Sequence, residues 1–308
     1  RSPAAVAPFK GNMDVKALEE LLAKRGKDVP FVMVTITCNS NGGQPVSMAN
    51  LQAVRKVCDR YKTPLFLDAA RFAENAWFIK QREPEYAKTS VAEIVRKMFG
   101  LADGATISAK KDGLVNMGGV LLIRDPEVFA RASELLILTE GFVTYGGLSG
   151  RDLEAMAIGL REVLDEDYLR YRVRSVEYLG EKLVEAGIAI VRPPGGHAVY
   201  IDAAAFCPQI PKELFPGQAL ACALYQVGGV RGCEIGSVML GAHATAELVR
   251  LAIPRRTYTQ SHIDYVLEVI LEARATAHQL TGFKIAGSPG ALRHFDANFE
   301  PCSAALPV

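Results

Sequence analysis

Two adjacent lysines, Lys110 and Lys111, stand in the stretch ISAKKDGLVNMGG at residues 107–119. A β-branched run and Ser108 precede them, and a glycine pair follows. A lysine pair is most often a solvated surface feature. A lysine amine that is shielded from water beside a second cation is, however, an effective nucleophile toward a carbonyl group. The stretch therefore predicts either a solvated pair or a reactive amine, and the rest of the chain has to distinguish these.

Other polar residues follow predicted strands in the same way. Asn39 follows the run PFVMVTITC at 30–38, and Asp68 ends PLFLD at 64–68, with Arg71 soon after. In doubly wound sheets, ligands bind beyond the carboxyl ends of the strands. Taken singly, Asp68 has a simpler explanation as a helix cap, and Asn39 as part of a turn. Taken together, these residues predict one site with a carboxylate, an amide, a guanidinium, a hydroxyl and an amine.

This set of groups suits pyridoxal 5'-phosphate. A lysine amine forms a Schiff base with the aldehyde of that cofactor. A carboxylate keeps the pyridine nitrogen protonated, so that the ring can accept electrons. Serine and arginine side chains hold phosphate. The sequence therefore predicts a pyridoxal phosphate site that uses one of the two lysines.

The elements that must position these groups alternate between strand and helix in the first half. Continuous β-branched runs indicate strands buried on both faces, and Ser47 is placed to begin a helix. This order predicts an α/β fold with a doubly wound, mainly parallel sheet and right-handed crossovers. We expect residues 1–160 to form the C-terminal portion of a large cofactor-binding domain and residues 161–308 a smaller α+β domain. A helical stretch at 152–186 is long enough to join the two.

The composition narrows the class of protein. The chain has 308 residues, 49% hydrophobic and 22% charged, with a formal net charge of +1, which does not favour a nucleic-acid or membrane partner. It has no run of 18 apolar residues, and the opening residues lack the apolar segment of a signal peptide. The six cysteines are scattered, which is typical of reduced thiols. We expect a soluble cytoplasmic enzyme that acts on a small molecule.

Over essentially its whole length, the chain resembles the β-eliminating lyases, the family of tryptophanase and tyrosine phenol-lyase. SAKKD and DAARFAENA together are highly specific for it. The resemblance implies the pyridoxal-phosphate-dependent transferase fold, shaped like aspartate aminotransferase. The stretches that carry the resemblance are NGGQPVSMAN (41–50), DAARFAENAWFIKQRE (68–83), SAKKDGLVNMGG (108–119), TYGGLSGRD (144–152), GGHAVYIDA (195–203), FPGQALACALY (215–225), RLAIPRRTYTQSHID (250–264) and LRHF (292–295).

The resemblance implies cofactor contacts for six residues: Asn39, Asp68, Arg71, Ser108, Lys110 and Lys111. Lys111, the second lysine, would form the Schiff base, and Asp68 would pair with the pyridine nitrogen. The amide and the guanidinium would lie at the ring hydroxyl. The serine and the first lysine would lie near the phosphate.

Further residues are implied on the substrate side. Arg250 would bind the substrate α-carboxylate, and Tyr145 would line the site as a catalytic residue. His294 would be a third catalytic residue beside Lys111 and Tyr145, and Ile235 would contact the substrate side chain. The backbone near Asn116 would lie by a monovalent cation site, with K⁺ as its occupant.

The substrate is the point on which the sequence leaves alternatives. At the positions of Ile235 and His294, tyrosine phenol-lyases have arginine and phenylalanine, whereas tryptophanases look like this chain. We therefore expect a tryptophan indole-lyase that gives pyruvate and ammonium and works as a homo-oligomer, a dimer or tetramer.

Two departures from the family keep other interpretations open. The segment at 241–247 is shorter than the family's loop, and a thiolate leaves without ring protonation, so the chain could be a carbon–sulfur lyase acting on cysteine or a cysteine conjugate. The family's N-terminal part, with a Gln-Gly-Arg phosphate loop and a ring-stacking aromatic, has no counterpart here. The chain could thus need a separate N-terminal segment, or be an inactive or structural remnant.

Overall fold

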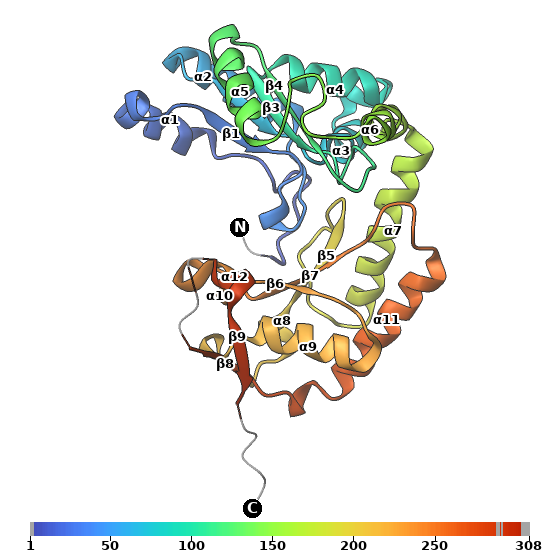
Figure 1. The fold of residues 1–308 in the computed structure, drawn as a ribbon. Coiled ribbons are helices and arrows are strands. Elements are labelled where there is room, and N and C mark those ends of the chain that lie inside the picture. The colour runs from blue at the N-terminus through green and yellow to red at the C-terminus, as the bar shows by residue number, and fades with distance from the viewer. Residues whose placement is uncertain (1–2, 288–289, 291, 303–308) are drawn as a thin grey trace, which may run out of the picture. The chain divides into compact units, whose positions relative to one another are not determined.

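The computed structural model describes residues 3–287, 290 and 292–302, and Figure 1 traces the chain. The chain divides into two compact units, Pro8–Tyr171 and a second one made of Arg1–Ala7 with Arg172–Val308. The second boundary falls within helix α7 (Glu166–Glu185). The assignment of residues 1–160 to a cofactor-binding domain and of residues 161–308 to a small domain stays a prediction.

The unit Pro8–Tyr171 is built on a four-stranded sheet of order β1-β2-β3-β4 (Figure 1). Strands β1 (Val32–Thr35), β2 (Leu65–Asp68) and β3 (Gly104–Ser108) are parallel, and β4 (Gly119–Ile123) is antiparallel to β3. The parallel strands are joined through helices, as a doubly wound sheet requires. The carboxyl ends of three neighbouring strands therefore share one edge.

The helices of this unit start where short polar side chains can satisfy free backbone N–H groups. Ser47 Oγ accepts a hydrogen bond from Asn50 N at 3.0 Å and begins α2. Helix α3 is buried along most of its length, which suits its crossover position between β2 and β3. The helices are α1 (Val15–Arg25), α2 (Met48–Tyr61), α3 (Phe72–Arg82), α4 (Val91–Gly100), α5 (Pro126–Thr139) and α6 (Gly150–Glu162).

The other unit contains a three-stranded antiparallel sheet of order β5-β7-β6. Its strands are β5 (Ala198–Asp202), β6 (Cys233–Ile235) and β7 (Leu248–Ala252). A separate hairpin pairs β8 (Phe283–Ala286) with β9 (Asn298–Pro301). The helices after α7 are α8 (Ala203–Phe206), α9 (Pro216–Gly228), α10 (Ser237–Leu240), α11 (Gln260–Ala275) and α12 (Arg293–Asp296).

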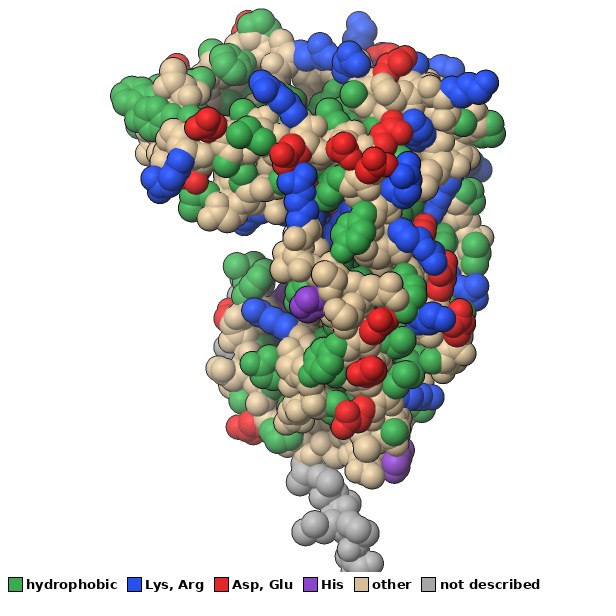
Figure 2. All heavy atoms as spheres, turned by 90° about the vertical axis from the view of Figure 1, so that its right-hand side faces the viewer, with side chains coloured by type: hydrophobic (Ala, Val, Ile, Leu, Met, Phe, Trp, Pro, Cys, Tyr) green, Lys and Arg blue, Asp and Glu red, His purple; other side chains and the backbone are tan. Residues whose placement is uncertain are grey.

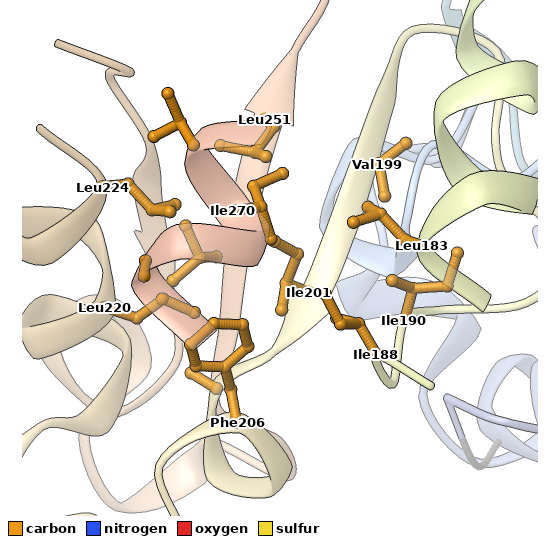
Figure 3. Packing of buried hydrophobic residues seen from close by; sticks show 14 of the residues in the cluster. Leu183, Ile188, Ile190, Val199, Ile201, Phe206, Leu220, Leu224, Leu251 and Ile270 are labelled. Atoms are coloured by element: carbon orange, nitrogen blue, oxygen red, sulfur yellow. The ribbon is translucent and has the colours of Figure 1, made fainter. Parts of the chain in front are cut away.

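One face of this small sheet forms the main core of the unit (Figure 3). Val199 and Ile201 of β5 and Leu251 of β7 pack with Leu220 and Leu224 of α9, and residues of α7 and α11 complete the cluster. Because side chains alternate along a strand, the intervening residues point to the other face. That second face carries Tyr200 of β5 and Arg250 of β7.

Two sequence expectations need correction. The stretch at 152–186 is two helices, because Asp165 Oδ1 accepts a hydrogen bond from Tyr168 N at 2.8 Å and starts α7 anew after α6 ends. The stretch IAIVR at 188–192, whose β-branched residues predict a strand, forms only an isolated bridge between Ile190 and Ile201. Pro193 has no N–H to donate and stops the pairing there.

The surface agrees with the balanced composition. In Figure 2, acidic and basic side chains lie interspersed on the face shown. Within the described residues, no helix has both the length and the apolar character needed to cross a membrane.

Candidate active site

The turn after β3 separates the two lysines. Lys111 N donates a hydrogen bond to Ser108 O at 3.1 Å, and Lys111 Nζ donates to Ser108 Oγ at 2.8 Å. Lys111 is half-buried, whereas Lys110 is exposed. The structure therefore directs the second lysine back onto the end of the strand and leaves the first in solvent.

Asp68 lies at the same edge of the sheet. It is the last residue of β2 and is paired in register with Thr35 of β1 and Thr106 of β3. Its backbone carbonyl accepts a hydrogen bond from Ile36 N at 2.9 Å. Thr106 precedes Ser108 by two residues, so the half-buried carboxylate and the lysine turn lie at neighbouring strand ends, as expected from the sequence.

Arg71 and Asn39 come from the segments that leave β2 and β1. Arg71 is buried just before α3, and its N–H donates to Ile36 O at 3.2 Å, which ties the two segments together. Asn39 is half-buried and opens a short 3₁₀ turn, Asn39–Asn41. Arg71 thus lies beyond the end of β2, and Asn39 lies beyond the end of the neighbouring strand β1.

Asp112 is a buried residue beside the lysine pair to which the sequence analysis assigned no role. Its side chain is fully buried, its N–H donates to Ala70 O at 3.3 Å, and its Oδ2 accepts from Ala73 N at 2.8 Å. Helix α3 has no side-chain cap at Arg71, so Asp112 supplies one from a distant part of the chain. Two features of the sequence point to Asp112. It is an acidic residue next to the lysine pair, and the segment that begins α3 has no capping side chain of its own.

Tyr145 and Asn116 belong to the same unit. Tyr145 is exposed in a turn where its ring meets that of Phe142 edge-on, with centroids 5.9 Å apart. Asn116 is exposed in the loop that leads to β4. Within the part of the chain that the structure describes, no three His, Cys, Asp or Glu residues are grouped to hold a metal ion. The roles of both residues, and K⁺, stay predictions.

Arg250 and Ile235 lie on the small sheet of the other unit. Arg250 of β7 is paired in register with Tyr200 and Cys233, so these three side chains share one face. Ile235 is buried in a small cluster with Tyr200, Leu248 and neighbouring residues. Ile235 and Leu248 are the next pair along this face, beside Arg250.

His294 approaches the same strand from α12. Its Nε2 lies 2.9 Å from the backbone carbonyl oxygen of Glu234 and 3.9 Å from Cys233 Sγ. Because a carbonyl oxygen only accepts, Nε2 carries the hydrogen in this contact. The structure thus gathers around one small sheet the two predicted substrate-binding residues, Arg250 and Ile235, and the predicted catalytic residue His294.

Comparison with known proteins identifies the family. The sequence profile of the β-eliminating lyases matches residues 2–268. The chain belongs to the β-eliminating lyase family. It is 56% identical to the tryptophanase of Salinibacter ruber over 97% of this chain and 65% of that protein. It is 53% identical to the tryptophanase of Hyphomonas neptunium, with 97% and 68% covered, and 49% identical to the tyrosine phenol-lyase of Intrasporangium calvum, with 98% and 66% covered.

The chain covers only part of each curated relative, and its similarity to solved structures concerns the fold. The chain of this β-eliminating lyase family member spans about two-thirds of the length of the curated relatives, from 65% to 68%. Among solved structures it is similar to "SPT with PLP", with a TM-score of 0.59, 16% identity, and 86% of this chain and 60% of that chain covered. A serine palmitoyltransferase from S. paucimobilis with a bound PLP–myriocin aldimine gives a TM-score of 0.58. The family and the fold class predicted from the sequence are confirmed.

Proposed function

We propose that this protein is a pyridoxal-phosphate-dependent lyase that removes the β-substituent of L-tryptophan and releases indole, pyruvate and ammonium. The observation that carries the proposal is the position of Lys111, whose turn is fixed at the carboxyl edge of the sheet beside Asp68. The unit Pro8–Tyr171 would be the cofactor-binding domain. The other unit would supply the residues that contact the substrate.

The groups at the sheet edge suit pyridoxal phosphate. They include a half-buried primary amine, a carboxylate at the end of β2, a buried guanidinium and a hydroxyl. Lys111 would hold the cofactor through Nζ, and Asp68 would keep the ring nitrogen protonated. Arg71 and Asn39 would donate to the ring hydroxyl, and Ser108 and Lys110 would lie near the phosphate. When bound, the cofactor takes up the electron pair released from the substrate α-carbon.

The remaining chemistry falls to the chain's own residues. The Ser108 hydroxyl accepts a hydrogen bond from Lys111 Nζ at 2.8 Å and would hold this amine at the end of β3. The lysine amine would also be a suitable base for the proton on the substrate α-carbon. Arg250 would bind the substrate α-carboxylate, with Tyr145 lining the site. Holding the substrate in one orientation would select which bond at the α-carbon reacts.

The choice of tryptophan depends on Ile235 and His294. An apolar Ile235 leaves the oxygen of a phenol leaving group without a partner. A buried polar group without a partner costs about 1–3 kcal/mol, which disfavours tyrosine by roughly tenfold to a hundredfold. The relatives include both tryptophanases and tyrosine phenol-lyases, so a direct comparison of the two substrates tests this discrimination.

The deciding experiment is a pyruvate-release assay of the full protein with tryptophan, tyrosine, cysteine and S-substituted cysteines side by side. Indole released together with pyruvate supports the proposal. Release of sulfide or a thiol with tryptophan untouched would replace it by a carbon–sulfur lyase. No release from any substrate, together with no cofactor binding, would indicate an inactive member of the family.

A further inference from the structure

Two buried carboxylates lie on either side of Gly236 in the small sheet's unit. Glu234 and Glu247 are only 3% and 5% exposed. A Cβ built at Gly236 would lie 2.8 Å from Glu234 Oε1 and 2.6 Å from Glu247 Oε2. The backbone between β6 and α10 therefore passes between two acidic groups, at a point where only a glycine leaves room for both.

The two carboxylates bind the start of α10. Glu234 Oε1 accepts from Val238 N at 3.0 Å, and its Oε2 accepts from Met239 N at 3.1 Å. Glu247 Oε1 accepts from Ser237 N at 3.0 Å, and its Oε2 accepts from Ser237 Oγ at 3.0 Å. The backbone N–H groups of residues 237–239 are thus bound by two side chains whose burial restricts their movement.

This arrangement is costly for a helix of one turn. Burial raises the pKa of Glu234 and of Glu247, and for Glu234 the nearby Glu247 carboxylate adds to the rise. A single serine or aspartate at the surface would start such a helix without burying two acidic groups. The pair therefore has an effect beyond starting α10, which is to fix the path of the backbone that leaves β6.

We propose that Glu234 is a positioning residue for the substrate side chain, assisted by Glu247. Its carboxylate holds residues 238–239, its own carbonyl accepts the Nε2 hydrogen of His294, and Ile235 follows it directly. One residue thereby sets the positions of both side chains on which the substrate choice depends. This inference rests on the proposed function, because it assigns Glu234 to the same substrate site.

The carbonyl contact places a hydrogen on Nε2 of His294. The other ring nitrogen, Nδ1, is buried and has no hydrogen-bond partner among the described residues. A shift of the Glu234 backbone would move this ring nitrogen. The effect of Glu234 should therefore depend on the leaving group and should not extend to the cofactor.

The test compares Glu234→Gln with Glu83→Gln. The side-chain oxygen of glutamine can accept a hydrogen bond from one of the two backbone N–H groups of residues 238–239. Its NH₂ group then faces the other N–H, and two donors cannot pair. Glu83 is a matched control, because it is also buried and accepts from two N–H groups at a helix start, Met48 N at 2.8 Å and Ala49 N at 3.2 Å. Glu83 belongs to the unit Pro8–Tyr171, so it tests the cost of the same substitution in a different unit from Ile235 and His294.

We expect Glu234→Gln to lower kcat/KM for tryptophan about tenfold relative to kcat/KM for an S-aryl cysteine, whose thiolate leaves without ring protonation. The visible absorbance of the bound cofactor should be unchanged. Glu83→Gln should leave the ratio of the two kcat/KM values as in the wild type. An equal loss for both substrates, or the same ratio change in the control, would overturn the proposal.

A second readout separates this inference from the proposed function. The imidazole ¹⁵N spectrum, with His294 assigned by His294→Gln, should shift in Glu234→Gln and in Gly236→Ala but not in Glu83→Gln. If the wild-type protein releases no pyruvate, the proposed function fails while the spectrum still tests the positioning of His294. An unchanged His294 signal in both variants would rule that positioning out.

Discussion

The carboxylate of Asp112 accepts a hydrogen bond from Ala73 N at 2.8 Å and so joins the turn of Lys111 to the segment that follows Asp68. This contact spans two separate stretches of the chain, and both carry proposed cofactor residues. The strand pairing brings their elements together, and Asp112 fixes how the turn lies against α3. The amine of Lys111 and the carboxylate of Asp68 therefore belong to two backbone segments that the Asp112 contact joins.

Replacing Asp112 should weaken cofactor binding as well as the fold. Asp112→Ala leaves a buried N–H without a partner, which should lower the free energy of unfolding by about 1–3 kcal/mol. Asp112→Asn keeps an oxygen acceptor and should lower it less. Denaturant unfolding and a pyridoxal phosphate titration measure the two effects. If Asp112→Ala binds the cofactor as tightly as the wild type, the turn does not depend on this contact.

Lys111 and Lys110 should differ sharply when each is replaced by alanine. Lys111→Ala should lose the visible absorbance band of the covalently held cofactor, because it removes the amine that would form the Schiff base. Lys110→Ala should keep the band and bind the cofactor more weakly, since the proposal places this cation near the phosphate. Absorbance spectra during titration distinguish the two. Survival of the band in Lys111→Ala would contradict the assignment.

Asp68 should matter for turnover more than for binding. In Asp68→Asn the side chain keeps its size but no longer favours a protonated ring nitrogen, so pyruvate release should nearly cease while the cofactor stays bound. Asp103→Asn is the control. It makes the same substitution at another acidic residue of this unit, just before β3, whose carboxylate accepts hydrogen bonds from Arg55 and Leu65 N. Full turnover in Asp68→Asn would remove Asp68 from the mechanism.

The positions of several proposed site residues could be predicted from the sequence, because each of them stands at the end of a short apolar run that forms a strand. Asp68 and Ser108 end short apolar runs, and parallel strands place such ends at one edge. Asp112 could not be found in this way, because its burial depends on a helix start 39 residues earlier in the chain. Strand β6 was missed because its middle residue is the acidic Glu234, whose burial becomes favourable only through N–H groups of α10.

The pair Lys80–Glu166 should make stability depend on pH within the Pro8–Tyr171 unit. Lys80 Nζ lies 2.8 Å from both carboxylate oxygens, and this hydrogen bond lowers the pKa of Glu166 below its usual 4.5. A lowered pKa in the folded state means that the stabilisation is present above pH 4.5 and is lost as pH falls through the folded value.

Glu166→Gln should therefore be less stable than the wild type at neutral pH, and the difference should shrink below pH 4.5. Unfolding curves in denaturant between pH 3 and pH 8 measure it. Glu93→Gln, which affects the exposed pair with Lys97, is the control and should change little at any pH. A difference that stays constant down to pH 3 would show that the charge of Glu166 is not its cause.

The apolar surface of helix α5 should be an interface between copies of the protein. None of its 14 residues is buried, and Leu135 and Leu138 are 63% and 82% exposed. Apolar side chains gathered on one exposed helix are typical of an interaction site. We expect a dimer or tetramer by analytical ultracentrifugation, and a lower mass for the double variant Leu135→Glu, Leu138→Glu. Tyr225→Glu, an exposed site in the other unit, should keep the wild-type mass. A wild-type protein that is both monomeric and active would contradict this prediction.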